Sequence, residues 1–373
     1  MSKKLNEIIL NRKSVIPEII CQLQKEKRKL ILLGCGGRGG KVYQVLKENK
    51  IHLDDVVVEK QDYRDNLMLF GTEIPVHCLD RVLDTETDFN VILGVSRRTI
   101  QKPDFFTNKK IHQIYDVTFG MGSFEGYSLT YEYYKEHEKE FEFVYERLED
   151  ERSRELYAAN INGRITNVDE DLTPSEWQKP QYFFQDMFSW EEQECLVDCG
   201  AYDGDTVQEF LNKIPKETDY RVFAFEPDEH NYKQLRDTYH SDKRINTYLK
   251  GVWREKTTLK FSTCGNEGSA ISNTGTGTTQ VEAIDDIIEN TKVTFIKMDV
   301  EGSELQALYG ARNTILRDKP RLGICLYHLK EDVWKIPQYV LSLLPEYKIY
   351  IRTHSSVPTA LTMFAIYPQG EKV

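Results

Sequence analysis

The sequence predicts an α/β protein in which two parallel-sheet units follow one another along the chain. Two observations predict this class. Short apolar runs alternate with amphipathic helical segments, and two of these runs end in glycine-containing turns. The first turn spans residues 34–39 and the second spans residues 198–206. With 373 residues, the chain is long enough for two domains of ordinary size.

The composition excludes several classes of protein. With 40% hydrophobic and 29% charged residues, the chain is typical of a soluble globular protein rather than a disordered one. A formal net charge of −11 argues against a nucleic-acid partner, because polyphosphate would be repelled. No apolar run is long enough for a membrane span or a secretory signal. The cysteines show no C-x-x-C spacing, which predicts neither a disulfide framework nor a zinc site and indicates a reducing, cytoplasmic compartment.

The first 122 residues are predicted to form a Rossmann-like accessory domain that begins with short amphipathic helices. Its expected strands are the runs KLILLGCG, DDVVVEK and FNVILGVS, and a helix is expected at about residues 39–49. Residues 123–190 are rich in Glu, Lys and Tyr and predict a helical connector. There Phe141, Val144, Tyr145 and Leu148 fall on one helical face, and Gly163 is the expected end of the helix.

A second alternation of strands and helices occupies residues 191–373. Strands are expected at 195–199, 221–226, 245–250, 293–298, 321–327, 346–351 and 361–367. The last two flank a segment too short for a crossover helix, so they should form an antiparallel hairpin. Five parallel strands followed by an antiparallel pair is the architecture of class I methyltransferases.

The second glycine turn is acidic, which bears on the charge of its ligand. Asp198 ends the apolar run, and Asp203 and Asp205 follow in the loop. These carboxylates would repel a pyrophosphate held at a helix N-terminus. S-adenosylmethionine carries an ammonium, a sulfonium and no phosphate, so the turn favours this cofactor. Gly200 and Gly204 would let the backbone approach the ligand closely.

Glu226 ends the next apolar run. An acid about 20 to 30 residues beyond the first turn is where α/β cofactor-binding folds place the carboxylate that binds the ribose hydroxyls. NAD sites share this feature, so Glu226 favours S-adenosylmethionine only in combination with the acidic turn. Ordinary helix capping is the alternative for Asp198 and Glu226.

Candidates for the reacting centre follow two later apolar runs. Asp299 and Glu301 come after VTFIKM, before Gly302 opens a helix. The carboxyl ends of central strands face the crevice in which α/β proteins bind ligands. His328 follows LGICLY, and its ordinary pKa suits a general base, although a packing or capping histidine is the alternative. For Glu304 the sequence favours an ordinary acid at a helix start.

From about residue 180 to 367 the chain resembles the FkbM family of S-adenosylmethionine-dependent methyltransferases. The motifs that carry the resemblance are VDCGAYDGDT at 197–206, FEP at 225–227, KMDVEGSE at 297–304, GA at 310–311, KP at 319–320 and YH at 327–328. Tyr202 stands where many members have asparagine, and Ser303 stands where they usually have alanine. Neither departure removes a charge, so both concern the substrate rather than the cofactor.

The resemblance implies methyl transfer from S-adenosylmethionine, with O-methylation of a sugar or glycoconjugate precursor as the expected reaction. The expected cofactor-binding residues are Asp198, Gly200, Ala201, Tyr202, Asp203, Gly204, Asp205, Thr206, Glu226, Pro227 and Asp299. Either His328 or the pair Asp299 and Glu301 is expected to assist deprotonation of the acceptor. Oxygen-rich ligands at these three residues would also suit magnesium or manganese, but the spacing is not diagnostic and no metal is predicted.

The first glycine turn has a different character. Gly34, Gly36 and Gly39 match G-x-G-x-x-G between a predicted strand and a helix, and Glu59 ends the next strand. The turn lacks acids and contains Arg38, so it suits a phosphate. It resembles the small Rossmann-like units that precede some bacterial sugar-modifying enzymes and bind nucleotide sugars. A nucleotide or nucleotide sugar, a vestigial or docking role, and NAD(H) all remain open.

Together these features predict a cytoplasmic methyltransferase that acts on a small-molecule or glycoconjugate acceptor, without nucleic-acid or membrane partners. Three alternatives remain. One is N-methylation of an amine on a glycan- or peptide-linked acceptor. Another is an NAD-dependent sugar oxidoreductase or epimerase that uses the first unit, and the third is a non-catalytic nucleotide-binding scaffold. The sequence leaves open whether the chain forms a homo-oligomer.

Overall fold

The chain forms two compact units in the computed structural model. The first comprises residues 1–138, 155–176 and 355–359, and the second comprises 139–154, 177–354 and 360–373. The structure describes residues 4–83, 87–95, 97–102, 104–116, 129–168, 181–183, 187, 189–262, 270–271, 277–288, 291–353 and 360–368. The domain boundaries expected at residues 122 and 190 stay predictions.

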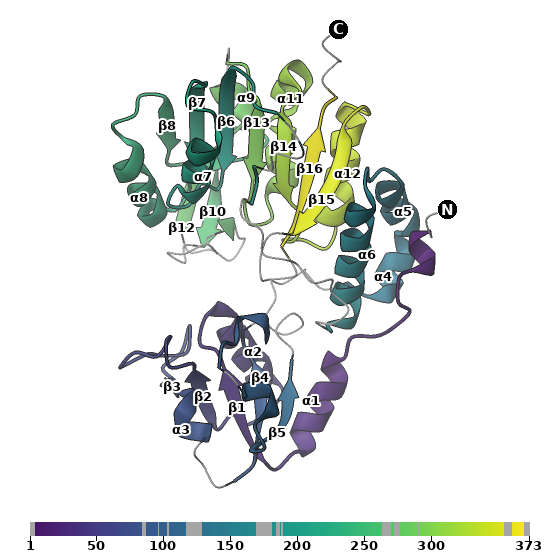
Figure 1. The fold of residues 1–373 in the computed structure, drawn as a ribbon, viewed down its shortest axis with the longest axis vertical. Helices are drawn as coiled ribbons and strands as arrows, with labels where there is room; N and C mark the ends of the chain where they lie inside the picture. Colours follow the sequence, from purple (N-terminus) through teal and green to yellow (C-terminus); the bar gives the residue numbers. More distant parts are fainter. Residues whose placement is uncertain are drawn as a thin grey trace. The chain divides into compact units, whose positions relative to one another are not determined.

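The first unit contains a five-stranded sheet in the order β3-β2-β1-β4-β5, with every strand pair parallel (Figure 1). Its strands are β1 (Lys29–Leu33), β2 (Asp55–Val58), β3 (His77–Cys78), β4 (Phe89–Leu93) and β5 (Ile111–Tyr115). The helices of this part of the chain are η1 (Leu5–Glu7), α1 (Ile16–Lys25), α2 (Gly37–Glu48), α3 (Leu79–Leu83), η2 (Arg97–Thr99) and η3 (Phe105–Thr107). The central strands β1 and β4 are almost entirely buried, as is typical of a parallel sheet with both faces covered. The predicted Rossmann-like sheet is confirmed.

The predicted helical segment contains α4 (Tyr131–Glu136), α5 (Glu138–Glu146) and α6 (Glu151–Thr166). Contrary to the sequence expectation, Gly163 does not end a helix, because α6 continues to Thr166. The left-handed conformation that terminates many helices falls instead on Asn167, at φ +57°, whose N–H donates to the Gly163 carbonyl at 2.8 Å. None of the described helices combines the length and the apolar character that crossing a bilayer requires.

The second unit contains a seven-stranded sheet in the order β15-β16-β14-β13-β6-β7-β8. Its strands are β6 (Gln193–Cys199), β7 (Asp219–Phe225), β8 (Ile245–Tyr248), β13 (Phe295–Met298), β14 (Arg321–Cys325), β15 (Lys348–Thr353) and β16 (Leu361–Ile366). The first five of these strands are parallel, whereas β16 runs antiparallel to both β14 and β15. The predicted class I methyltransferase sheet with its terminal hairpin is confirmed.

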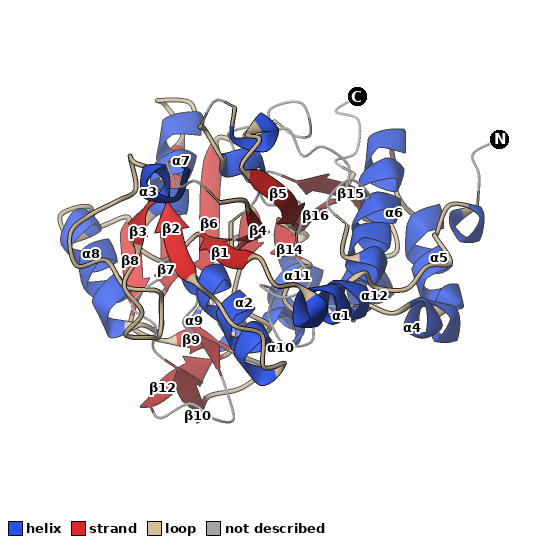
Figure 2. Ribbon diagram, turned by 90° about the horizontal axis from the view of Figure 1, so that it is seen from below, coloured by secondary structure: helices blue, strands red, loops and turns tan. Residues whose placement is uncertain are grey.

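Helices, coloured blue in Figure 2, alternate along the chain with the parallel strands of this sheet. They are α7 (Asp205–Lys213), α8 (Glu229–Tyr239), α9 (Ile284–Ile287), α10 (Glu304–Tyr309), α11 (Arg312–Asp318) and α12 (Asp332–Leu343). Every residue of β13 and β14 is buried, so these two strands lie at the centre of the core. Because the strands are parallel, the ends of β6, β7, β13 and β14 that carry the predicted site residues meet at one edge of the sheet.

A second, four-stranded sheet follows β8 and was not predicted. It has the order β11-β10-β12-β9 and is formed by β9 (Gly251–Val252), β10 (Thr257–Ser262), β11 (Ala270–Ile271) and β12 (Gly277–Glu282). Its longer strands alternate polar with apolar residues and contain no continuous apolar run, so a search for apolar runs overlooks them.

Candidate active site

The turn after β6 packs directly against the turn after β13. Gly200 has φ +81°, and a Cβ atom at this position would lie 1.9 Å from the carbonyl oxygen of Asp299. Only glycine fits both the left-handed backbone and this contact. The N–H groups of Gly200 and Ala201 donate to the carbonyl of Phe225, at 3.0 and 2.9 Å. The ends of three strands are therefore joined by their main chains.

A buried ion pair lies beneath this turn. The Nζ atom of Lys297 lies 3.1 Å from Oδ1 of Asp198 and donates to the Gly200 carbonyl at 2.6 Å. Burial raises the pKa of Asp198, and Lys297 only partly offsets this effect. Although burial alone would lower the pKa of Lys297, the carboxylates of Asp198 and Asp299 raise it, so the lysine stays protonated. Asp198 is completely buried, so its carboxylate faces this lysine rather than solvent.

Sequence reasoning did not select Lys297 as a site residue. The available signal was a lysine in the otherwise apolar run VTFIKM, since a buried charge normally needs a charged partner. The structure supplies that partner in Asp198, one strand away in the parallel register that pairs these two residues. Lys297 thus fixes the carbonyl of the glycine turn and neutralises the acid that begins it.

Glu226 joins the turn after β6 to the segment before α8. Its Oε2 accepts the N–H of Tyr202 at 2.9 Å, and its Oε1 accepts the N–H of Asp228 at 2.8 Å. The N-cap of α8 is Asp228, not Glu226, so simple capping does not explain this glutamate. Burial raises the pKa of Glu226 to about 7. Each carboxylate oxygen retains a lone pair for a further donor, as ribose recognition requires.

The other acids of the turn begin α7. Oδ1 of Asp203 accepts the N–H of Asp205 at 3.2 Å, and Oδ1 of Asp205 accepts the N–H of Thr206 at 2.6 Å. Both acids are at least partly exposed, whereas Ala201, Gly204 and Thr206 are buried and Pro227 is half-buried. Asp203 and Asp205 therefore stabilise the helix start and also add negative charge beside the turn.

Tyr202 adopts the left-handed conformation, with φ +50°. Asparagine tolerates this conformation better than other residues with a side chain, which gives a physical reason for the asparagine that many FkbM methyltransferases have there. In this conformation the N–H of Tyr202 donates to the carboxylate of Glu226.

Asp299 is the centre of the acid cluster at the end of β13. Its Oδ1 accepts the hydroxyl of Tyr327 at 2.8 Å, and its Oδ2 lies 3.5 Å from the hydroxyl of Tyr182. The Nε2 atom of His328 lies 3.5 Å from Oδ1. Burial would raise the pKa of Asp299, but His328, Lys297 and the Tyr327 hydroxyl together lower it. Asp299 is therefore an ionised acceptor, and 23% of its side chain is exposed.

Glu301 lies beside Asp299 in a strained backbone conformation. Its φ is +53°, and Gly302 follows at φ +94°, so two successive left-handed residues turn the chain into α10. Oε1 of Glu301 lies 3.5 Å from Nε2 of His328, and 17% of the side chain is exposed. Burial raises the pKa of Glu301, although His328 partly offsets this.

Glu304 has a larger role than the helix-starting acid that the sequence favoured. It is completely buried, and its Oε1 accepts the N–H of Val300 at 2.9 Å, while its Oε2 accepts the N–H of Gly302 at 3.1 Å. Oε1 also lies 2.7 Å from Nδ1 of His328. One carboxylate therefore fixes the acid-bearing turn and one ring nitrogen of the histidine. The sequence signal was an acid three residues after another acid, which is too common to be diagnostic.

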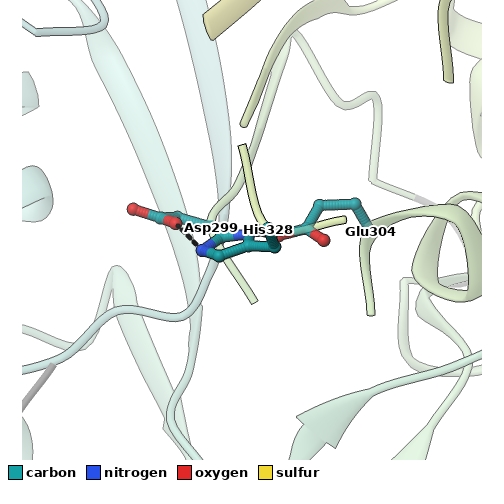
Figure 3. Close-up of side chains that lie close together, drawn as sticks. All are labelled: Asp299, Glu304 and His328. Carbon is teal, nitrogen blue, oxygen red and sulfur yellow. Dashed lines mark hydrogen bonds and ion pairs between the residues drawn. The ribbon is translucent and has the colours of Figure 1, made fainter. Parts of the chain in front are cut away.

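His328 lies between acids on both sides of its ring, as the close-up shows for Asp299 and Glu304 (Figure 3). The side chain is only 3% exposed. Burial would lower its pKa, but Glu304 and Glu301 raise it well above the ordinary value. Since a protonated imidazole has no free lone pair, this environment disfavours His328 as the general base and favours a carboxylate.

The side chains of Asp299, Glu304 and His328 each offer a ligand atom within 4.8 Å of the others, a spacing that a metal ion could use. Glu304, however, contacts Nδ1 and two main-chain N–H groups, whereas Asp299 faces Nε2 on the other side of the ring. As the side chains stand, each of these two carboxylates faces a different ring nitrogen of His328, an arrangement that suits a histidine cation.

The first glycine turn, in the other unit, has glycines of two kinds. A Cβ atom at Gly39 would lie 2.3 Å from the carbonyl of Gly34, so close backbone packing requires this glycine. Around Gly36 there is no atom within 4 Å of the equivalent point. Arg38 lies in the first turn of α2 and is half-buried. The carboxylate of Glu59 accepts the main-chain N–H groups that follow η2, at Gln101 and Lys102.

The carboxylate of Glu59 is therefore buried against the main chain of its own unit and does not extend into open space. The first turn retains the shape of a phosphate-binding turn, since an uncovered glycine leads into a helix N-terminus. Its ligand, whether nucleotide sugar, another nucleotide or NAD(H), stays a prediction.

An open groove of about 1460 Å³ lies at the other edge of the seven-stranded sheet, where its parallel strands begin. Three of the cations that line it are paired with acids: Arg321 with Glu194, Lys292 with Glu191, and Arg244 with Asp242. Open α/β sheets bind ligands at the carboxyl ends of their strands, so this groove is not the predicted cofactor site.

Residues 198–349 match the family model described as the Methyltransferase FkbM domain. The crystal structure of Methyltransferase FkbM from Methylobacillus flagellatus KT is similar to this chain with a TM-score of 0.72 and 22% sequence identity, over 96% of this chain and 95% of that one. At this identity the similarity shows the fold, and it extends over nearly the whole of both chains. No curated protein sequence matches the chain.

Two other solved structures are similar over about half of this chain. Fibrillarin from Aeropyrum pernix, in complex with natively bound S-adenosyl-L-methionine, has 11% identity and a TM-score of 0.30 over 47% of this chain and 67% of its own. A SAM-dependent O-methyltransferase from Thermotoga maritima has 13% identity and a TM-score of 0.29 over 48% of this chain and 61% of its own. The family match identifies a methyltransferase domain, so the predicted enzyme class, a methyltransferase, is confirmed.

Proposed function

We propose that the chain transfers a methyl group from S-adenosylmethionine to a hydroxyl group of a sugar or glycoconjugate precursor in the cytoplasm. The observation that carries this proposal is the excess of carboxylates at the edge of the seven-stranded sheet where its parallel strands end. Five acids gather there with two cations: Asp198, Glu226, Asp299, Glu301 and Glu304 with Lys297 and His328. A negative site suits a cofactor that carries a sulfonium and an ammonium.

In this proposal the cofactor lies across the turn after β6. Glu226 would accept both ribose hydroxyls, because each of its oxygens has a lone pair left after the bonds to Tyr202 and Asp228. The main chain of the turn would hold the methionine part of the cofactor. Lys297 keeps this turn in place by donating to the carbonyl of Gly200. Asp299, ionised and partly exposed, would face the sulfonium.

The chemistry is an in-line displacement at the sulfonium methyl carbon. The acceptor oxygen forms the new bond to carbon, the carbon–sulfur bond breaks, and its electron pair returns to sulfur. The hydroxyl proton passes to a carboxylate of the cluster, for which the two partly exposed candidates are Asp299 and Glu301. Positioning the acceptor beside these two acids is the main catalytic task of the protein.

Calorimetric titration with S-adenosylhomocysteine and, in parallel, with NAD tests the proposal. We expect micromolar binding of S-adenosylhomocysteine and no heat from NAD. Heat from NAD alone would mean that the first glycine turn is the working cofactor site, as in the oxidoreductase alternative. Methyl groups from labelled S-adenosylmethionine that appear in a sugar fraction as alkali-stable ethers would support O-methylation. Label recovered as N-methylamine would contradict it.

The affinity for S-adenosylhomocysteine should depend on pH through Glu226. In the unliganded protein this carboxyl has its pKa raised to about 7, and ribose hydroxyls would favour the ionised form. Binding therefore lowers the pKa and releases a proton. The affinity should rise as the pH increases through 7, and it should be up to about tenfold lower at pH 6 than at pH 8. Calorimetry at pH 6, 7 and 8 in buffers of different ionisation enthalpy would count the protons.

The matched control for this experiment is Glu226→Gln, which should bind more weakly but with the same affinity at all three values of pH. An unchanged affinity from pH 6 to 8 in the wild-type protein, with no proton released, would contradict a ribose contact by Glu226.

The charge of Asp299 should make the site prefer a cationic ligand over a neutral one. Sinefungin carries an amine near the position of the transferable methyl group, whereas S-adenosylhomocysteine has an uncharged sulfur. We expect sinefungin to bind about fivefold more tightly, or about 1 kcal/mol, because the attraction acts at a partly exposed site. In Asp299→Asn the preference should disappear, and in Asp237→Asn, an exposed acid of α8, it should persist. Equal affinities in the wild-type protein would place the sulfonium away from Asp299.

A further inference from the structure

His328 is buried between the carboxylates of the acid cluster. From α10, Glu304 faces its Nδ1, and from the turn after β13, Asp299 and Glu301 face its Nε2. The ring of Tyr327, two residues after β14, lies with its centroid 4.2 Å from that of the imidazole. The other cation of the cluster is Lys297, which pairs with Asp198 and also lowers the pKa of Asp299.

The contacts define where the protons of this imidazole must be. A carboxylate only accepts hydrogen bonds, so the 2.7 Å contact with Glu304 requires a proton on Nδ1. In a neutral imidazole, Nε2 would then present a lone pair to two carboxylate oxygens at 3.5 Å. That arrangement is repulsive, whereas a proton on Nε2 makes both contacts attractive.

We propose that Glu304 is a positioning residue that keeps His328 as a doubly protonated cation between the acids and thereby fixes Asp299 and Glu301 in the reacting centre. The inference rests on the proposed function for its catalytic meaning. Glu304 also accepts the N–H groups of Val300 and Gly302, so it holds the backbone of Glu301 on one side and the histidine on the other.

This arrangement assigns the proton-accepting role to Glu301. His328 has no lone pair to offer, and Asp299 is the weaker base, because His328, Lys297 and the hydroxyl of Tyr327 at 2.8 Å lower its pKa. Glu301 is partly exposed, and its raised pKa brings it closer to the range in which a carboxylate accepts a proton efficiently. In the transfer step the acceptor oxygen would lose its proton to Glu301 as it gains the methyl group.

Nitrogen NMR of the full-length protein with labelled histidine tests the proposal. The spectra would be recorded with EDTA present, and His328 would be assigned from its loss in His328→Gln. In the wild-type protein both ring nitrogens of His328 should show the shifts of protonated nitrogens from pH 6 to 9. In Glu304→Gln the proton affinity of the ring should fall at least about tenfold, so that one nitrogen loses its proton within this range.

Glu229→Gln is the matched control, because Glu229 is likewise the first residue of its helix but is exposed. It should leave the His328 spectrum unchanged. An unprotonated ring nitrogen in the wild-type protein at pH 7 would overturn the proposal, and so would a Glu304→Gln spectrum identical to the wild type. The wild-type result decides the first point even if the variant does not fold.

Binding of S-adenosylhomocysteine, measured on the same samples, separates this proposal from the proposed function. If the wild-type protein does not bind S-adenosylhomocysteine but both His328 nitrogens are protonated, the proposed function fails and the histidine cation stands. If the wild-type protein binds S-adenosylhomocysteine but His328 is neutral, the histidine cation is ruled out and the proposed function stands.

Discussion

Replacing Lys297 with methionine is expected to lower the free energy of unfolding of the second unit by about 3–5 kcal/mol. Lys297 is buried and lies 3.1 Å from Asp198, which is completely buried. Methionine fills a similar volume, but it leaves the Asp198 carboxylate without its cation and the Gly200 carbonyl without its donor. The loss should therefore reflect an uncompensated charge rather than a cavity.

Tryptophan fluorescence during urea unfolding can measure this change. All four tryptophans of the chain lie between residues 177 and 334, within the second unit, so the signal reports that unit. Lys233→Met, at an exposed position in α8, is the control and should change stability by less than about 0.5 kcal/mol. The double variant Asp198→Asn with Lys297→Met should recover much of the loss. A loss below about 1 kcal/mol for Lys297→Met alone would show that the pair contributes little.

Glu226→Ala should weaken the binding of S-adenosylhomocysteine by about 30- to 1,000-fold, or about 2–4 kcal/mol. The substitution removes the proposed acceptor of both ribose hydroxyls. It also leaves the N–H groups of Tyr202 and Asp228 without the acceptor that joins their two segments. The same titration that detects cofactor binding in the wild-type protein measures the loss.

Glu229→Ala, three residues further along the chain and exposed, serves as the control for Glu226→Ala and should bind as the wild type does. If Glu226→Ala binds within about threefold of the wild-type affinity while remaining folded, the ribose lies elsewhere. In that case the hydrogen bonds of Glu226 serve only to hold the turn against α8.

The sequence predicted the parts of this fold that depend on apolar runs. The strands β6, β7, β13 and β14 each contain a buried and mostly apolar stretch, which is easy to recognise in the sequence. The sheet that contains β10 and β12 escaped prediction because one face of these strands is polar. The end of α6 was misplaced because Asn167, not Gly163, takes the left-handed conformation, and either residue type can do so.

Only part of the candidate site could be predicted from the sequence, because Lys297 was not selected and Glu304 was expected only to start a helix. Asp299, Glu301 and His328 were selected because they follow apolar strands, and the structure brings these three together. The contact between Glu304 and Nδ1 of His328 depends on a turn with two successive left-handed residues, which no spacing rule encodes. Whether His328 carries one proton or two depends on those contacts, so the sequence could not assign its role.

The contact between Gly200 and Asp299 limits how this enzyme can diversify. Any side chain at residue 200 would collide with the Asp299 carbonyl, and Lys297 holds the Gly200 carbonyl from the strand that leads to Asp299. The two loops are therefore one epistatic unit, in which a change on one side is tolerated only with a matching change on the other. Libraries that seek new acceptors should keep these three positions fixed and randomise half-buried neighbours such as Tyr202.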